Sequence, residues 1–486
     1  MSSPVLVFNY DISCPFAYIA STRVRSLAAR TNATLIYRPV LLGAIYRATA
    51  APQGASGSAS DVFNPTKKAV TSASMSRTLK RYKMQFNQPP QHPRKSVDAL
   101  RLLYCIEGEQ RVKLTEKFFE AYWVAGRDVT CKAELLAIAQ ENGITQLTLE
   151  SFNSPTARKE LETATAEAIS RGAFGVPGFW IPDAQWTDIN NRRQTGRFFW
   201  GQDRMHFVEA TLLTLGNPQG WCALAWPPSL LPRCIPASRP CRRVATKLQF
   251  WFDLSSPWAF LAYTQLPRLR RRYSHLQIEM KPFLLGILFR EIGAPNMPML
   301  AASPAKAAWS TQDLADWTAW WNAVGTAEEA GARAQSLRFT WPRVFPIRTP
   351  TALRVGLVQE KSLDALYAAC WQHDKNVSDE RVLAHVLTRA GYDGPELVRR
   401  ANEVEAKARL RGLTAEAKAL GICGVPTYRV LRDDGAGGWK PVGGLVWGQD
   451  ETNVVEDLIM GWDPETSEEM AEVRTGEDKA SSSAKL

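Results

Sequence analysis

The chain has 486 residues, of which 45% are hydrophobic and 22% charged, and this composition excludes collagen-like, low-complexity and wholly disordered chains. The net charge of +11 is moderate, and its clearest basic run, residues 268–272, falls late in an expected helix, where arginines complement the helix dipole. We therefore expect no nucleic-acid partner. No apolar run approaches the roughly 20 residues that span a bilayer, so we also expect no membrane span.

The predicted elements of the first part of the chain alternate between strand and helix. Residues 5–10 form a short apolar run that is typical of a buried strand, and Pro15 favours a helix start soon after it. Residues 35–39 predict a second strand, and residues 64–171 have a helical pattern. Two strands and a helix follow, at 176–181, at 198–200 and from 201 onwards. The order βαβ, long helical insert, ββα predicts an α/β sheet with an inserted helical domain.

The second part of the chain repeats the motifs of the first part in the same order. The recurring blocks are residues 8–20 as 250–262, 39–43 as 282–286, 92–94 as 345–348, 123–130 as 371–378, 175–177 as 424–426, and 200–203 as 447–450. Chance does not produce so many ordered blocks at a nearly constant spacing. The sequence therefore predicts two tandem copies of one domain.

The repeat divides the chain into four predicted segments. These are copy 1 at 1–215, a proline-rich linker at 216–246, copy 2 at 247–462, and an acidic, disordered tail at 463–486. Trp221 and Trp226 are apolar residues inside the linker, and they predict that the linker docks on a domain. The cysteines and histidines do not have the spacing of a zinc site, and we expect no metal. An apolar run begins directly after Pro4, so we expect no secretory signal.

Cys14 stands at the predicted start of the first helix. Free amides and the helix dipole at such a position stabilise a thiolate and lower its pKa. The structural alternative is a cysteine that acts as a small buried residue. Ser256 takes the same place in copy 2, and its structural alternative is an N-cap serine.

Pro177 and Pro426 each follow Gly-Val directly before a predicted strand. A cis peptide bond there would leave the backbone of Val176 or Val425 able to pair with an extended peptide. The structural alternative is a proline on an edge strand.

Gln202, Asp203 and Arg204 open the last predicted helix of copy 1. An amide-rich helix start can bind a carboxylate, and Asp203 could hold an ammonium group. The structural alternative is an aspartate that complements the helix dipole.

Together these motifs resemble the kappa-class glutathione transferases and, equally, the glutathione-dependent 2-hydroxychromene-2-carboxylate isomerases. The resemblance rests on Asp-x-x-Ser-Pro-aromatic, Phe-Gly-Val-Pro and Trp-Gly-x-Asp-Arg, and it covers nearly all of each copy. It implies an α/β fold of two tandem DsbA-like thioredoxin-fold domains, each with a helical insertion. It also implies glutathione as the cofactor.

The resemblance further implies which residues form the sites. The serine that donates a hydrogen bond to the glutathione sulfur matches Ser256, and Cys14 departs from it in copy 1. The arginine kept as Arg204 becomes Glu451 in copy 2. The implied glutathione-binding residues are Val176, Pro177, Gln202, Asp203, Arg204, Val425, Pro426, Gln449 and Asp450, together with Lys67 or Lys68 and Lys306 in the inserts.

The function implied first is a glutathione-dependent transferase or isomerase that acts on a small hydrophobic electrophile through a glutathione thiolate. A second hypothesis is a monothiol glutathione-linked oxidoreductase or peroxidase that uses Cys14. Ala17 replaces the second cysteine of a disulfide oxidoreductase, so an intramolecular dithiol cycle cannot run. A third hypothesis is a non-catalytic binding or scaffold protein.

The last three residues, Ala484-Lys485-Leu486, resemble the peroxisomal signal Ser-Lys-Leu. We expect a peroxisomal protein recognised by an import receptor, with a cytoplasmic location as the alternative. Because enzymes of the resembled family dimerise, an intramolecular pseudo-dimer of the two copies is a further expectation.

Overall fold

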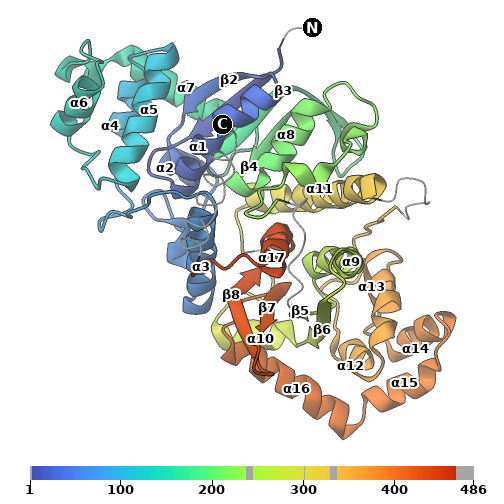
Figure 1. Cartoon of the computed structure of the whole chain (residues 1–486). Coiled ribbons are helices and arrows are strands. Elements are labelled where there is room, and N and C mark those ends of the chain that lie inside the picture. The colour runs from blue at the N-terminus through green and yellow to red at the C-terminus, as the bar shows by residue number, and fades with distance from the viewer. Residues whose placement is uncertain (1–2, 237–244, 300, 329–335, 467–486) are drawn as a thin grey trace, which may run out of the picture. The chain divides into compact units, whose positions relative to one another are not determined.

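The computed structural model describes residues 3–236, 245–299, 301–328 and 336–466 (Figure 1). Copy 1 contains β1 (Val5–Tyr10), α1 (Pro15–Arg30), β2 (Thr34–Pro39), α2 (Leu42–Ala48), α3 (Pro65–Arg81), α4 (Val97–Leu103), α5 (Gly108–Trp123), α6 (Lys132–Glu141), α7 (Pro155–Ser170), β3 (Gly178–Thr187), β4 (Arg193–Trp200) and α8 (Met205–Leu213). This order confirms the predicted βαβ, helical insert and ββα.

Copy 2 repeats this order after the linker, with the α-helix Gly394–Ala401 where copy 1 has the 3-10 helix Leu149–Asn153. It contains β5 (Thr246–Phe252), α9 (Pro257–Arg272), β6 (Leu276–Pro282), α10 (Leu285–Ile292), α11 (Pro304–Glu328), α12 (Pro350–Val358), α13 (Leu363–Trp371), α14 (Glu380–Arg389), α15 (Gly394–Ala401), α16 (Val404–Ala419), β7 (Thr427–Asp433), β8 (Trp439–Trp447) and α17 (Thr452–Ile459). The structure therefore confirms a duplicated α/β fold.

Each copy is built on a four-stranded mixed sheet. The strand order is β2-β1-β3-β4 in copy 1 and β6-β5-β7-β8 in copy 2. In both sheets the first strand pairs in parallel with the second and antiparallel with the third. Both faces of the first strand are covered: Leu6, Phe8 and Tyr10 on one face have no exposed surface, and Val7 and Asn9 on the other are at most 4% exposed. The end of this central strand positions the loop that leads to Cys14 or Ser256.

A buried aspartate at the end of the first strand organises that loop in each copy. The Asp11 carboxylate accepts hydrogen bonds from the backbone N–H of Ser13 at 3.0 Å and of Leu42 at 2.9 Å. Asp253 makes the equivalent bonds to Ser255 and Leu285 at 2.9 and 3.0 Å. Buried carboxylates must be satisfied in this way, and the bonds fix the starts of two helices to one strand end.

The chain forms two compact units whose boundaries differ from the linear repeats. Unit 1 comprises Met1–Val62, Met84–Leu231 and Met297–Gln335, and unit 2 comprises Phe63–Lys83, Pro232–Asn296 and Ser336–Leu486. Helix α3 of copy 1 therefore belongs to unit 2, and helix α11 of copy 2 belongs to unit 1. Each unit combines most of one copy with one insert helix of the other copy.

The first half of the linker packs on unit 1 through Trp221. The Trp221 ring stacks on Phe207 with ring centroids 4.8 Å apart, and its indole N–H donates to the Thr211 hydroxyl at 3.2 Å. Trp226 is 36% exposed. The predicted docking of the linker is thus confirmed at Trp221, the more buried of the two tryptophans.

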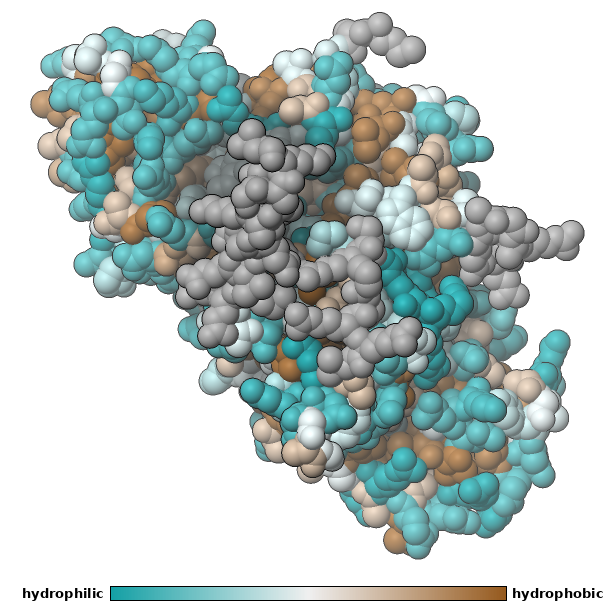
Figure 2. Space-filling model, viewed as in Figure 1, coloured by the Kyte–Doolittle hydropathy of each residue, from teal (hydrophilic) through white to brown (hydrophobic). Residues whose placement is uncertain are grey.

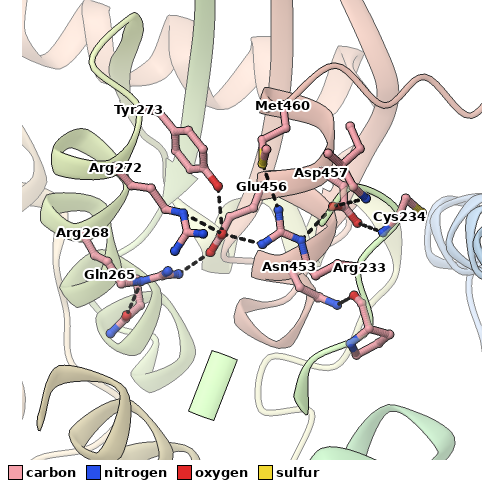
Figure 3. Close-up of polar contacts among 12 residues, drawn as sticks. Arg233, Cys234, Gln265, Arg268, Arg272, Tyr273, Asn453, Glu456, Asp457 and Met460 are labelled. Carbon is pink, nitrogen blue, oxygen red and sulfur yellow. Dashed lines mark hydrogen bonds and ion pairs between the residues drawn. The ribbon is translucent and has the colours of Figure 1, made fainter. Parts of the chain in front are cut away.

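Linker residues 232–235 dock on α17 in unit 2, and Figure 3 shows the contacts of Arg233 and Cys234. Arg233 forms ion pairs with Asp457 at 2.7 Å and with Glu456 at 2.8 Å. Asp457, which has no exposed surface, also accepts hydrogen bonds from the backbone N–H groups of Cys234 and Ile235. Residues 237–244 and 467–486, which include most of the predicted tail and its Ala484-Lys485-Leu486 signal, lie outside the described residues.

Within the described ranges, no helix is long and apolar enough to cross a bilayer. The same ranges contain no group of three or more histidine, cysteine, aspartate or glutamate residues placed to hold a metal ion. On the face in Figure 2, hydrophilic residues predominate and hydrophobic residues form small areas between them.

Candidate functional site

Cys14 is the N-cap residue of α1, at the place that the sequence indicated. Its side chain makes no capping bond; instead the thiol donates a hydrogen bond to the carbonyl oxygen of Val176 at 3.2 Å. The fold therefore brings together two predicted site residues that are far apart in the sequence. The contact also engages a carbonyl group that was expected to pair with a peptide ligand.

The expectation that the helix start lowers the pKa of Cys14 is wrong. Burial raises the pKa of the Cys14 thiol to about 12, because the thiolate would lose its hydration. Backbone amides of Ala17 and Phe16 act in the opposite direction, but their effect is smaller than that of burial. At neutral pH the thiol stays protonated, and a protonated thiol is a poor nucleophile.

Ser256 occupies the equivalent N-cap position of α9 in copy 2 and is equally buried. Its hydroxyl oxygen accepts a hydrogen bond from the backbone N–H of Ala259 at 3.3 Å. This confirms the N-cap interpretation of the serine. The capping bond uses a lone pair and not the hydroxyl proton, so Ser256 keeps the ability to donate to a bound anion.

Both predicted cis peptide bonds are present, at Val176–Pro177 and Val425–Pro426. The strands that follow begin at Gly178 and Thr427, so the valines lie in the preceding loops rather than inside a strand. The carbonyl oxygens of Pro177 and Pro426 each accept a hydrogen bond from the glycine of the Trp-Gly-Gln-Asp motif, at 3.0 Å in both copies. The two predicted motifs are therefore adjacent in each unit.

A glycine before each Val-Pro pair permits close approach of a tryptophan. A Cβ atom added at Gly175 would lie 2.9 Å from the indole nitrogen of Trp200. A Cβ atom added at Gly424 would lie at the same distance from the indole nitrogen of Trp447. These contacts place an aromatic ring beside each cis-proline loop.

The motif residues that follow Trp200 have different surroundings. Gln202 is buried, and its side-chain oxygen accepts a hydrogen bond from Arg23 at 3.0 Å. The Asp203 side chain is 41% exposed and forms an ion pair with Arg204 at 2.6 Å. Arg204 also forms a two-point ion pair with Asp313 of α11. Its guanidinium thus holds protein carboxylates, which points to a positioning role rather than to direct ligand contact.

Copy 2 arranges the equivalent residues on the short 3-10 helix Gln449–Glu451. Gln449 is 1% exposed, and its backbone carbonyl oxygen accepts a hydrogen bond from Thr452 at 2.6 Å. Asp450 is half-buried. Only the aspartate of each pair therefore reaches the surface of its site.

The insert lysines lie at the sites of the opposite copies. The Lys306 ammonium of copy 2 lies 5.4 Å from the centre of the Trp200 ring, in unit 1. The Lys67 ammonium of copy 1 lies 5.6 Å from the Trp447 ring and 4.1 Å from the Phe63 ring, in unit 2. Lys68 is exposed. Of the two lysines left open by the sequence, Lys67 is the one beside the motif.

The Lys67 ammonium and the Cys423 thiol, both in unit 2, affect each other's pKa. Burial lowers the pKa of Lys67, and the nearby Cys423 thiol opposes that shift. Burial raises the pKa of Cys423 to about 12, while the Lys67 charge acts to lower it. The sequence did not single out Cys423, although it directly precedes the Gly-Val-Pro motif and stands where copy 1 has Phe174.

Trp309 was also missed by the sequence reasoning. Its ring centre lies 5.5 Å from that of Phe174 and 5.2 Å from that of Trp200. Trp309 follows Lys306 by three residues on α11, so the two side chains share one helix face. Helical spacing could have linked them to each other, but nothing local in the sequence links them to copy 1.

Comparisons with known proteins give the same two-part division. The family model described as DSBA-like thioredoxin domain matches residues 5–213 and again residues 247–460. A 2-hydroxychromene-2-carboxylate isomerase from Sphingobium xenophagum is 27% identical over 207 residues, which is 42% of this chain and 96% of that protein. Glutathione S-transferase kappa 1 from Caenorhabditis elegans is 23% identical over 222 residues, which is 44% of this chain and 90% of that protein.

Among solved structures, that of a 2-hydroxychromene-2-carboxylate isomerase matches with a TM-score of 0.34 and 19% identity. The match covers 42% of this chain and 92% of that chain. The structure of the cytosolic disulfide reductase DsbM from Pseudomonas aeruginosa with GSH matches with a TM-score of 0.28 and 16% identity, over 45% of this chain and 95% of that one.

Proposed function

Because the chain belongs, in both of its copies, to the family of DSBA-like thioredoxin domains, we propose that it is a glutathione-dependent transferase or isomerase. Its substrate in this proposal is a small hydrophobic electrophile. Both curated relatives carry names of such activities, and this chain covers 90% or more of each relative. The proposal assigns the reaction to the site of copy 2, at Ser256.

The observation that carries the assignment is the different bonding of Cys14 and Ser256. The Cys14 thiol donates a hydrogen bond to the carbonyl oxygen of Val176, and its pKa is raised to about 12. The Ser256 hydroxyl accepts its capping bond and retains its proton for donation. A hydroxyl donor at a helix start stabilises a neighbouring thiolate, because both the donor and the helix dipole favour negative charge.

Glutathione, when bound, supplies the thiol whose thiolate is the nucleophile. In copy 2 the donor set fits such a tripeptide: Ser256 donates to the sulfur, the backbone of Val425 pairs with the extended peptide, Lys67 attracts a carboxylate, and Asp450 attracts the ammonium group. Each residue binds or orients one end of the ligand. Ser256 is the residue that acts on the reacting atom.

An aromatic cluster supports a hydrophobic electrophile. The indole N–H of the buried Trp371 donates to the carbonyl oxygen of Leu254 at 2.8 Å, two residues before Ser256. Trp341 packs against Trp371 with ring centres 6.1 Å apart and is itself 37% exposed. Trp341 is thus linked to the Ser256 loop through Trp371, and as a partly exposed tryptophan it offers apolar contact area to a substrate.

The test measures glutathione binding and ionisation in the full chain. Calorimetry is expected to show glutathione binding, and ultraviolet difference spectra are expected to show a thiolate signal at neutral pH. The Ser256→Ala variant should bind glutathione but lose most of the thiolate signal. The matched Cys14→Ser variant should retain it. Absence of binding, or a signal that depends on Cys14 and not on Ser256, would overturn the proposal.

The redox alternative at Cys14 has weaker support. A monothiol cycle needs an accessible thiolate, whereas Cys14 is buried and its pKa is raised. Glutathione-dependent disulfide reduction that disappears in Cys14→Ser would nevertheless establish that alternative.

A further inference from the structure

Arg204 and Glu451 occupy the same position in the two copies, directly after the Trp-Gly-Gln-Asp motif, but carry opposite charges. In unit 1, the Arg204 guanidinium forms two hydrogen bonds of 2.9 Å to the Asp313 carboxylate of α11. Their side chains are 9% and 3% exposed, so this is a buried ion pair. It joins copy 1 to the insert helix that copy 2 supplies.

In unit 2 the charges on the helix and on the body of the copy are reversed, although the helix charges stand at other positions, because Ser74 is the α3 residue that matches Asp313. Helix α3 of copy 1, which packs on β8, brings the buried Arg77 and the half-buried Arg81 to the part of unit 2 that contains Glu451. The negative charge of Glu451 acts to raise the pKa of both arginines, against the effect of burial. Here the helix supplies the positive charge and the body of the copy supplies the negative charge.

A second position shows the same reversal. Asp316 of α11 forms an ion pair with Arg197 of β4. Arg77 of α3 stands at the matching place, ten residues after its lysine, and donates to the carbonyl oxygen of Gly443 in β8 at 3.0 Å. Its guanidinium also approaches Gly444, the residue that corresponds to Arg197. Copy 2 therefore has a glycine where an arginine would repel Arg77.

The two ion pairs in unit 1 and the charges in unit 2 distinguish the observed arrangement from the alternative in which each helix packs on its own copy. In that alternative, Asp313 would face Glu451, and Arg77 would face Arg197. Like charges buried together are strongly unfavourable, because neither burial nor mutual repulsion is compensated. Interfaces that discriminate between partners use such repulsive contacts as well as attractive ones.

We propose that Arg204 and Glu451 are partner-selecting residues: Arg204 docks α11 on copy 1, and Glu451 favours α3 on copy 2 and repels α11 from it. Arg197 adds the repulsion that keeps α3 from packing on copy 1. The selection determines which lysine reaches which site, because Lys306 and Lys67 lie on the exchanged helices. It also accounts for the loss of the arginine in copy 2. The proposal does not rest on glutathione binding, and its test needs no ligand.

The test is a charge-reversal cycle in the full chain, read by hydrogen–deuterium exchange of α11 and α3. Arg204→Glu and Asp313→Arg should each accelerate amide exchange in α11 by about 10-fold or more, because docking opens more often. The double variant Arg204→Glu/Asp313→Arg should restore slow exchange in α11. Glu451→Arg should accelerate exchange in α3 and leave α11 unchanged.

The neutral variant Arg204→Met separates lost attraction from repulsion and should accelerate exchange in α11 less than Arg204→Glu does. Exchange in α5 reports on the fold of copy 1 and should stay constant in every variant. Unchanged exchange of α11 in both single reversals would overturn the proposal. The proposal would also be overturned if amide exchange in α11 were no slower in the double variant than in the single variants while α5 remained protected.

Discussion

The Cys14 thiol donates a hydrogen bond to the carbonyl oxygen of Val176 at 3.2 Å, and the two residues come from opposite ends of copy 1. This bond marks the difference between the two copies. The equivalent Ser256 caps its own helix instead and bonds to the backbone N–H of Ala259. The same place in the fold thus holds a protonated thiol in one copy and a hydroxyl with an available proton in the other.

The first prediction concerns alkylation of Cys14. Because burial raises the pKa of Cys14 to about 12, its thiolate is scarce at neutral pH. We expect iodoacetamide to modify Cys14 on the order of 100-fold more slowly than the exposed Cys131 and Cys222, as followed by peptide mass spectrometry. Modification of Cys14 ahead of these two cysteines would contradict this account of its environment.

The second prediction concerns helix capping. Cys14→Ser should stabilise the chain by about 0.5–1 kcal/mol, because serine can accept the capping bond that cysteine does not make. The reciprocal Ser256→Cys should destabilise it by about 1 kcal/mol. Urea unfolding monitored by circular dichroism measures both. Cys222→Ser, in the exposed part of the linker, is the control and should have little effect.

The third prediction concerns the glycines before Val-Pro. Gly175→Ala and Gly424→Ala should each lower the free energy of unfolding by about 1–3 kcal/mol, because the new methyl group would displace the indole of Trp200 or Trp447. Thermal unfolding and tryptophan fluorescence measure the loss and the displacement. Gly412→Ala, on an exposed face of α16 with open space around it, should instead stabilise the helix.

The fourth prediction concerns acid stability. The Arg268 and Arg233 guanidinium groups hold the pKa of Glu456 at about 2, although burial acts to raise it. Since the folded-state pKa is below the unfolded one, this stabilisation is present above the unfolded pKa and is lost as the pH falls towards about 2. Glu456→Gln should lower the free energy of unfolding at pH 7 by about 3 kcal/mol. The stability of this variant should also fall less on acidification than that of the unmodified chain.

Urea unfolding across that acidic range tests the fourth prediction. Glu209 is the matched control, because it corresponds to Glu456 on α8 and pairs with Arg30, whose side chain is 56% exposed. We expect Glu209→Gln to cost less than Glu456→Gln. Equal losses in the two variants would show that the buried cluster of Figure 3 has no special role.

Local sequence patterns were sufficient to predict much of the fold. The apolar run at 5–10 is β1, the Pro15 signal is the start of α1, and the order of elements repeats in copy 2. The Val176–Pro177 and Val425–Pro426 motifs were also recognised from neighbouring residues. These features could be predicted because strand periodicity, helix starts and turns depend on residues close together in the chain.

Only the tertiary structure determined the pKa of Cys14 and the packing of the insert helices α3 and α11 on the opposite copies. A helix start favours a thiolate, but burial at the Val176 loop outweighs that effect, and burial is set by residues distant in sequence. Likewise, Lys67 and Lys306 reach their sites on helices that pack on the other copy. The order of motifs reveals the duplication from the sequence alone, whereas the copy on which each insert helix packs depends on which buried charges come into contact in the folded chain.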